Sequence, residues 1–170
     1  ESIMHSKLQE MGADPCQFTL VHAPDVISMS SSPVKSFAER PHSSMAVGFD
    51  MLRDGGIQGF CSAGNSGAML VGAYFKVGLS REDLRPCLIS ILPNQHGHDG
   101  ILLDVGANAD CKPENLLDFA ILGATYAESV LKIEHPRVGL VNIGEEPEKG
   151  NQLSIAAHKL MAEYNGLNFV

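Results

Sequence analysis

The fold expected for this chain rests on residues 57–67, which read Ile57-Gln58-Gly59-Phe60-Cys61-Ser62-Ala63-Gly64-Asn65-Ser66-Gly67. The first part, Ile57–Ser62, predicts a short strand, and it passes directly into a turn rich in Gly and Asn. The residues from the turn to about Val77 predict a helix. A strand that runs through a Gly-rich turn into a helix is the repeating unit of α/β proteins, and we expect that class here.

Apolar runs that predict strands alternate with amphipathic runs that predict helices along the rest of the chain. The predicted helices are Ser2–Met11, Ser43–Arg53, Pro113–Lys132 and Gln152–Tyr164, Pro33–Arg40 is read as a loop or a short helix, and the further predicted strands are Gln17–His22, Cys87–Leu92, Ile101–Val105, Val138–Ile143 and Leu167–Val170. Strands that are apolar throughout are typical of a parallel sheet covered on both faces. We therefore expect a three-layer α/β/α fold with a Rossmann-like, mostly parallel sheet, formed by residues 1–170 as a single domain.

Composition excludes several classes of protein. The chain has 170 residues and a net charge of −8, and its 12 basic residues are scattered, which argues against a nucleic-acid partner. No apolar run approaches the ~20 residues of a membrane span, and the start has no signal peptide. The four cysteines form no CxxC pair, so we expect free thiols and a cytoplasmic protein. The first residue is Glu1, which suggests a piece of a longer enzyme.

Gly and Asn occur together at the ends of three predicted strands. The segments are Ser62–Ala68, Asp104–Asp110 and Asn142–Glu146. In open α/β sheets, ligands bind beyond the carboxyl ends of the strands, so these segments predict a binding site. The alternative is that each is only a tight turn with a capping residue. The dinucleotide motif GxGxxG and the phosphate loop GxxxxGK[ST] are both absent, which removes support for hydride transfer and for ATP chemistry.

The first of these segments predicts a phosphate site. A helix follows directly, so its free N–H groups and its dipole favour an anion. The residues assigned to phosphate binding are Ser62, Gly64, Asn65, Ser66 and Gly67. Lys149, in the acidic run Glu145–Asn151, is a candidate cation for phosphate or for a developing oxyanion, or else part of a solvated charge cluster.

Other polar residues have simpler interpretations. Ser43 and Ser44 precede a predicted helix and cap it, or place hydroxyl groups near a ligand. His96 and His98 with Asp99 invite a metal site, but a surface loop is preferred, and we expect no metal. Cys61 and Cys111 flank the Gly-Asn turns without a defined His partner, so they are read as small hydrophobic residues rather than nucleophiles.

These residues resemble the bacterial phosphate acyltransferase family PlsX, also called acyl-ACP:phosphate transacylase. The matching motifs are Ser43–Met45, Ser62–Ala68, Leu103–Asn108, Cys111–Glu114, Pro136–Leu140, Asn142–Glu146 and Lys149–Asn151. The resemblance covers the middle of the family's sequence and lacks its N-terminal strand and its C-terminal third. Ser66 stands where the family usually has Thr, and the basic cluster before Ser43 is thinner, with Arg40-Pro41-His42.

The resemblance implies that long-chain acyl-ACP and inorganic phosphate give acyl phosphate and free ACP, for bacterial phospholipid synthesis. It implies a homodimer, no cofactor, and peripheral membrane contact through segments outside this chain. Backbone N–H groups and amides at Asn65 and Asn108, together with Lys149, suit stabilisation of the oxyanion. The residues assigned to substrate binding are Ser43, Ser44, Asp104, Gly106, Asn142 and Gly144. The alternatives are a short-chain phosphate acetyl- or butyryltransferase that uses acyl-CoA, and a non-catalytic fragment that binds phosphate or ACP.

Overall fold

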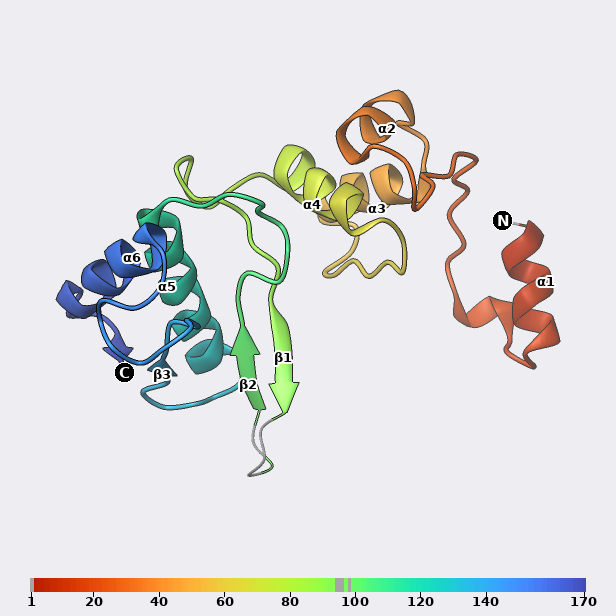
Figure 1. Ribbon diagram of the computed structural model, residues 1–170. Coiled ribbons are helices and arrows are strands. Elements are labelled where there is room, and N and C mark those ends of the chain that lie inside the picture. The colour runs from red at the N-terminus through yellow and green to blue at the C-terminus, as the bar shows by residue number, and fades with distance from the viewer. Residues whose placement is uncertain (1, 94–96, 98) are drawn as a thin grey trace. The chain divides into compact units, whose positions relative to one another are not determined.

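The structure is a computed structural model that describes residues 2–93, 97 and 99–170 (Figure 1). The chain divides into two compact units, Glu1–Leu79 and Ser80–Val170. Each unit is described by itself below. The loop residues His96 and His98, for which a metal had been considered, lie outside the described residues.

The first unit is helical. It contains α1 (Ser2–Glu10), the 3₁₀-helix η1 (Pro15–Gln17), α2 (Pro33–Glu39), α3 (Ser44–Arg53) and α4 (Ser66–Gly72), which continues as the π-helix η2 (Ala73–Val77). Local sequence explains the ends of α3. Ser43 caps its first turn, and Gly55 follows its last turn with a φ of 74°, a conformation that favours glycine.

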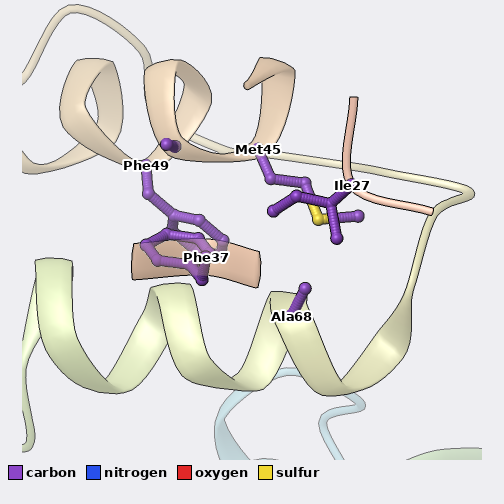
Figure 2. Packing of buried hydrophobic residues seen from close by; sticks show 6 residues of the cluster. Ile27, Phe37, Met45, Phe49 and Ala68 are labelled. Atoms are coloured by element: carbon purple, nitrogen blue, oxygen red, sulfur yellow. The ribbon is translucent and has the colours of Figure 1, made fainter. Parts of the chain in front are cut away.

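The core of the first unit lies between α2, α3 and α4. Its buried members are Ile27, Phe37, Met45, Ala46, Phe49 and Ala68. Figure 2 shows Met45 and Phe49 pointing from α3 towards α4, with Ala68 of α4 facing them and Phe37 of α2 beside Phe49. The rings of Phe37 and Phe49 meet edge to face at 6.3 Å between centroids, and those of Phe49 and Phe60 at 5.0 Å. This cluster fixes the start of α4, where the first Gly-Asn segment lies.

The second unit combines strands and helices. Strand β1 (Ser90–Pro93) pairs antiparallel with β2 (Asp99–Leu102), with Ser90 opposite Leu102. Strand β3 (Arg137–Val138) pairs parallel with β4 (Asn168–Phe169). The long helices α5 (Pro113–Ser129) and α6 (Gln152–Glu163) pack against each other and bury Phe119, Gly123, Ala127, Ala157 and Met161 (Figure 1).

The structure mixes helices with small sheets, which agrees with the α/β class, and the predicted helices are confirmed. Pro33–Arg40, read as a loop or a short helix, contains the short helix α2.

The predicted strands are confirmed only in part, because Cys87–Leu92, Ile101–Val105 and Leu167–Val170 overlap β1, β2 and β4. Gln17–His22 and Ile57–Ser62 form no strand, and Val138–Ile143 contributes only its first residue to β3. The pair β1–β2 is antiparallel, whereas a parallel arrangement was expected. The described residues form two two-stranded sheets, so the continuous sheet of a three-layer fold is not seen among them.

The physical reason is that a strand depends on its neighbours. A helix closes its hydrogen bonds within one segment, whereas a strand needs a second segment to supply donors and acceptors. Apolar composition alone therefore predicts which residues suit a sheet and leaves open whether a partner is in place. No helix among the described residues is both long and apolar enough to cross a membrane.

Candidate functional site

Asn65 begins α4 with its side chain almost fully buried, at 6% exposure. Its Oδ1 accepts a hydrogen bond from the N–H of Ala68 at 3.0 Å and so caps α4. Its Nδ2 donates to the carbonyl oxygens of Ser28, Met29 and Ser31, each at 3.2 Å. The amide therefore fastens a distant loop to the start of α4, and its polar atoms are occupied by the backbone.

The residues around Asn65 carry the hydroxyl and backbone N–H groups of this segment that remain available to bind a ligand. Ser62 and Ser66 are exposed, and the Ser62 hydroxyl accepts from the N–H of Gly64 at 3.1 Å. The N–H groups of Ser66 and Gly67 are the first two of α4, which helix geometry leaves without an intrahelical acceptor. A Cβ on Gly67 would lie 2.5 Å from Cγ of Pro33, so only glycine allows this close approach. The segment thus offers two backbone donors and a hydroxyl at an accessible surface.

Ser43 is a structural cap. Its side chain is fully buried, and its hydroxyl accepts from the N–H of Ala46 at 3.3 Å. The capping interpretation is confirmed for Ser43, because its hydroxyl is used inside the protein. Ser44, the first residue of α3, is exposed.

Asp104 organises the second Gly-Asn segment. Its Oδ1 accepts from the N–H of Leu88 at 2.7 Å, and its Oδ2 accepts from the backbone N–H of Asn108 at 2.8 Å and from the Nδ2 of Asn108 at 3.1 Å. The same Nδ2 donates to the carbonyl of Pro86 at 2.9 Å. Asp104 and Asn108 therefore join the turn after β2 to the segment before β1, and both hydrogens of the Asn108 amide are engaged.

The ionisation of this cluster follows from its contacts. Burial alone would raise the pKa of Asp104, but the hydrogen bonds from Leu88, Asn108 and Ala107 outweigh it, so the pKa lies below its ordinary value. Burial raises the pKa of the Cys87 and Cys111 thiols, and the Asp104 charge adds to both shifts. Raised thiol pKa values keep these cysteines protonated near neutral pH, which is unfavourable for a nucleophile.

Lys149 lies in a tight turn after the third segment. Asn142 closes the turn by donating from Nδ2 to the carbonyl of Lys149 at 2.8 Å. Gly150 follows with a φ of 99°, and a Cβ there would lie 2.3 Å from Oδ1 of Asn142, so glycine is required. The Lys149 side chain is exposed, and no carboxylate of the described residues lies within 4.0 Å of its ammonium group. The turn therefore presents an unpaired cation.

The second and third segments line one cavity within the second unit. Its volume is about 1070 Å³, and its walls come from the end of β2, from α5, from residues 136–143 and from the start of α6. Asp104, Asn108 and Asn142 are among the lining residues, so these two segments contribute to one cavity. Lys149 is not a lining residue, but Asn142 and Gly150 on either side of its turn are.

Comparison with known proteins identifies the family. A family described as "Fatty acid synthesis protein" matches residues 3–170. The chain belongs to this family, the PlsX family. A curated relative from Thermoanaerobacterium thermosaccharolyticum, named phosphate acyltransferase, is 45% identical over 152 residues, which are 89% of this chain and 45% of the relative.

Other PlsX relatives agree. A phosphate acyltransferase of Herpetosiphon aurantiacus is 39% identical over all of this chain and 46% of its own length. One of Clostridium tetani is 38% identical over all of this chain and 50% of its own length. The chain thus spans about half the length of the curated PlsX relatives it matches.

Sequence reasoning missed part of the site of this PlsX chain. The loop with Ser28, Met29 and Ser31 was not singled out, although it holds the Asn65 amide. Its serine-rich run before Pro33 was the available signal. Asn151 was also missed as the cap of α6, where its Oδ1 accepts from the N–H of Ser154 at 2.9 Å. No group of three or more metal-binding side chains occurs among the residues that the structure describes.

Proposed function

We propose that this chain is part of a phosphate acyltransferase that moves a long acyl chain from acyl-ACP to inorganic phosphate. The observation that carries the proposal is the family match over residues 3–170, with relatives named phosphate acyltransferase. The products are acyl phosphate and free ACP, in bacterial phospholipid synthesis. The reaction requires no cofactor and no metal.

The chemistry suits the groups that the predicted site residues present. An oxygen of phosphate attacks the thioester carbonyl carbon, a tetrahedral oxyanion forms, and the carbon–sulfur bond then breaks. The thiol leaving group has a pKa of about 8.5, so the thiolate leaves readily and takes up the proton released by phosphate. An enzyme must then mainly hold phosphate beside the thioester and stabilise the oxyanion. The protonated state of Cys87 and Cys111 fits a route without an enzyme nucleophile.

We assign a direct role in binding or catalysis to groups that are not already engaged in hydrogen bonds within the protein. Phosphate binds to the segment Ser62–Gly67 through the N–H groups of Ser66 and Gly67 and the Ser66 hydroxyl. Lys149 supplies the charge for the oxyanion. The exposed Ser44 and the turns that contain Asp104, Gly106, Asn142 and Gly144 contact substrate. Asn65 and Asn108 act as positioning residues rather than as direct donors, because their amides already bind backbone or carboxylate oxygens.

We further propose that residues 1–170 belong to one α/β domain whose three-layer, mostly parallel sheet is completed in a longer protein. Val141 and Ile143, at 82% and 86% exposure, support this, because a central strand would bury such side chains. A homodimer in the cytoplasm, with peripheral membrane contact through segments beyond this chain, belongs to the same proposal. The support for it is family membership.

The test is phosphate-dependent formation of acyl phosphate from hexadecanoyl-ACP by the full-length gene product, with hydroxylamine as the trap. We expect product with acyl-ACP and little with short-chain acyl-CoA. Turnover of acyl-CoA alone would move the protein to the short-chain phosphotransacylases. Binding of phosphate or ACP without any product would favour the non-catalytic alternative.

Lys149→Ala tests the assigned cation. Loss of one oxyanion donor lowers kcat by about 10²–10³-fold. Lys159→Ala is the matched control, because Lys159 is an exposed lysine of α6 whose partner is Glu163. We expect the control to keep full turnover and both variants to keep the wild-type circular dichroism spectrum. Equal turnover of Lys149→Ala and wild type would remove Lys149 from the mechanism.

A further inference from the structure

The turn that carries Lys149 is closed by hydrogen bonds within the second unit. The N–H of Lys149 donates to the carbonyl oxygen of Glu146 at 2.9 Å, and the carbonyl oxygen of Lys149 accepts from Nδ2 of Asn142 at 2.8 Å. Both backbone polar groups of Lys149 are therefore engaged, one within the turn and one by the segment that follows β3. Supporting hydrogen bonds of this kind hold a functional group in one place.

The Asn142 side chain lies against the peptide that joins Lys149 to Gly150. Its Nδ2 binds the carbonyl oxygen of Lys149, and a Cβ on Gly150 would lie 2.3 Å from its Oδ1. The same Cβ would lie 2.1 Å from Oγ of Ser154, which itself donates to the carbonyl oxygen of Asn151 at 3.0 Å. The Lys149 turn is thus enclosed between Asn142 and the first turn of α6.

Gly144 makes room for the stem of the Lys149 side chain. A Cβ on Gly144 would lie 3.0 Å from Cγ of Lys149 and 2.9 Å from Oε2 of Glu146. The methylene groups of the lysine therefore pack against the bare backbone of Gly144. The φ of Gly144 is not positive, so close packing rather than backbone conformation accounts for glycine at this position.

We infer that Asn142 and Gly144 are positioning residues that hold Lys149 in one orientation, Asn142 through the lysine backbone and Gly144 through the side-chain stem. The inference rests on the proposed function for the role of Lys149, and it gives the Asn142 amide a task other than direct contact with substrate. Misplacement of a catalytic group by about 1 Å costs about 10²-fold in rate. Loss of either support therefore lowers kcat.

A double-mutant cycle separates positioning from substrate contact. The rate of acyl phosphate formation from hexadecanoyl-ACP is measured for the full-length gene product with Asn142→Ala, with Lys149→Ala and with both changes. We expect Asn142→Ala to lower kcat by about 10–100-fold and to leave KM for acyl-ACP and for phosphate within about twofold of wild type. In the Lys149→Ala background the same change should lower kcat by less than about twofold, because no ammonium group remains to be placed.

Two outcomes of the cycle would overturn the inference while the proposed function stands. One is an equal loss of kcat from Asn142→Ala in both backgrounds, as expected of a merely structural residue. The other is a rise in KM with kcat unchanged, as expected of a direct contact with substrate. Gly144→Ala, taken through the same cycle with Lys149→Ala, should give the same pattern, and it is the second variant if Asn142→Ala fails to fold.

Asn168→Ala is the matched control. The Nδ2 of Asn168 also donates to a backbone carbonyl oxygen, that of His135 at 3.2 Å, and the side chain is exposed. Asn168 pairs with Arg137 at the start of β3, whereas Asn142 lies beyond the end of β3. We expect full turnover from this variant. A loss of kcat as large as that of Asn142→Ala would show that the position of Asn142 beside Lys149 is not the cause, and would overturn the inference.

Hydrogen–deuterium exchange tests the support of the turn without turnover. Mass spectrometry follows the peptide of residues 142–152 in the full-length gene product, where the Lys149 N–H is bound to Glu146. Loss of the Asn142 hydrogen bond should speed exchange in this peptide by about fivefold, and Asn168→Ala should exchange as wild type does. Unchanged exchange in Asn142→Ala would overturn the inference. If the wild-type protein formed no acyl phosphate, the proposed function would fail, and the exchange result would decide by itself whether Asn142 holds the turn.

Discussion

The hydrogen bonds of the Asn65 side chain go to backbone groups of the protein, which leaves its amide unavailable as a donor to a substrate. Its side chain caps α4 through Ala68 and binds the carbonyl oxygens of Ser28, Met29 and Ser31. The sequence analysis assigned a functional role to Asn65 from its place after a predicted strand. It could not reveal which groups the side-chain amide contacts. That depends on a loop more than 30 positions away in the chain, which no local pattern encodes.

We predict that Asn65→Ala lowers the free energy of unfolding of the first unit by about 2–3 kcal/mol. A helix cap contributes ~1 kcal/mol, and the part-buried hydrogen bonds from Nδ2 contribute ~1–2 kcal/mol together, because water replaces some of them at the exposed loop. Urea unfolding followed by circular dichroism measures this. Ser66→Ala, at an exposed position, should change stability by less than ~0.5 kcal/mol. Equal effects of the two changes would contradict the structural role of Asn65.

Asp104 gives a prediction about pH. Its pKa in the folded protein lies below the value in the unfolded chain, so its contribution to stability is complete above about pH 4 and is lost as the pH falls through the folded value. Asp104→Asn should therefore destabilise the second unit at pH 7 by about 1–2 kcal/mol, reduced by partial solvent access. Urea titrations at pH 7, 4 and 2.5 should show the difference closing towards low pH.

Asp110→Asn is the control for that series, because Asp110 is exposed. Its stability should parallel wild type at every pH. The difference in free energy of unfolding between Asp104→Asn and wild type should shrink at pH 2.5. If this difference were the same at pH 2.5 as at pH 7, the hydrogen-bonded Asp104 carboxylate would not be the cause of the destabilisation.

At the scale of elements, the helices followed from local sequence and the sheet did not. The ends of α3 could be read from Ser43 and Gly55, because caps act within one turn. Ile57–Ser62 has the composition of a strand, but no segment of the described residues pairs with it. The site followed the same rule. Asp104 and Asn142 both line the cavity of the second unit, whereas the hydrogen-bond partners of the Asp104 carboxylate and of the Asn142 amide could not be predicted from their spacing in the sequence.

The packing of α4 on α3 supplies a prediction at this scale. A Cβ on Gly72 would lie 2.2 Å from Cδ2 of Phe49 and 2.9 Å from Cε2 of Phe37. Overpacking of this kind costs ~1–3 kcal/mol, which exceeds the gain of up to ~1 kcal/mol in helix propensity from Gly to Ala. We expect Gly72→Ala to destabilise the first unit. The chain has no Trp, so far-UV circular dichroism is the suitable probe.

Gly59→Ala is the comparison for Gly72→Ala. A Cβ on Gly59 meets no atom within 4 Å. The change should leave the urea midpoint within the error of measurement. A loss of stability as large as that of Gly72→Ala would show that backbone freedom, rather than contact with Phe49, decides the outcome.

At the scale of the whole molecule, the two units have separate cores. The first is built on Phe37 and Phe49, and the second on Phe119 and Met161. We predict that the isolated 170-residue chain unfolds in two steps, and that Gly72→Ala moves only one of them. In the full-length gene product, where we propose a completed sheet, the steps should merge. A single step in the isolated chain that shifts as a whole would contradict the separation into two cores.

The contact between Asn65 and the Ser28 loop also bears on how fast the first unit folds. It joins residues 37 positions apart, so a long loop must close before the cap of α4 and the carbonyl groups of the loop are satisfied together. Contacts of this sequence separation raise contact order, and a higher contact order slows folding. By contrast, α5 and α6 form from local hydrogen bonds. The start of α4 should therefore be among the last parts of its unit to reach native structure, with mutations there changing the unfolding rate more than the folding rate.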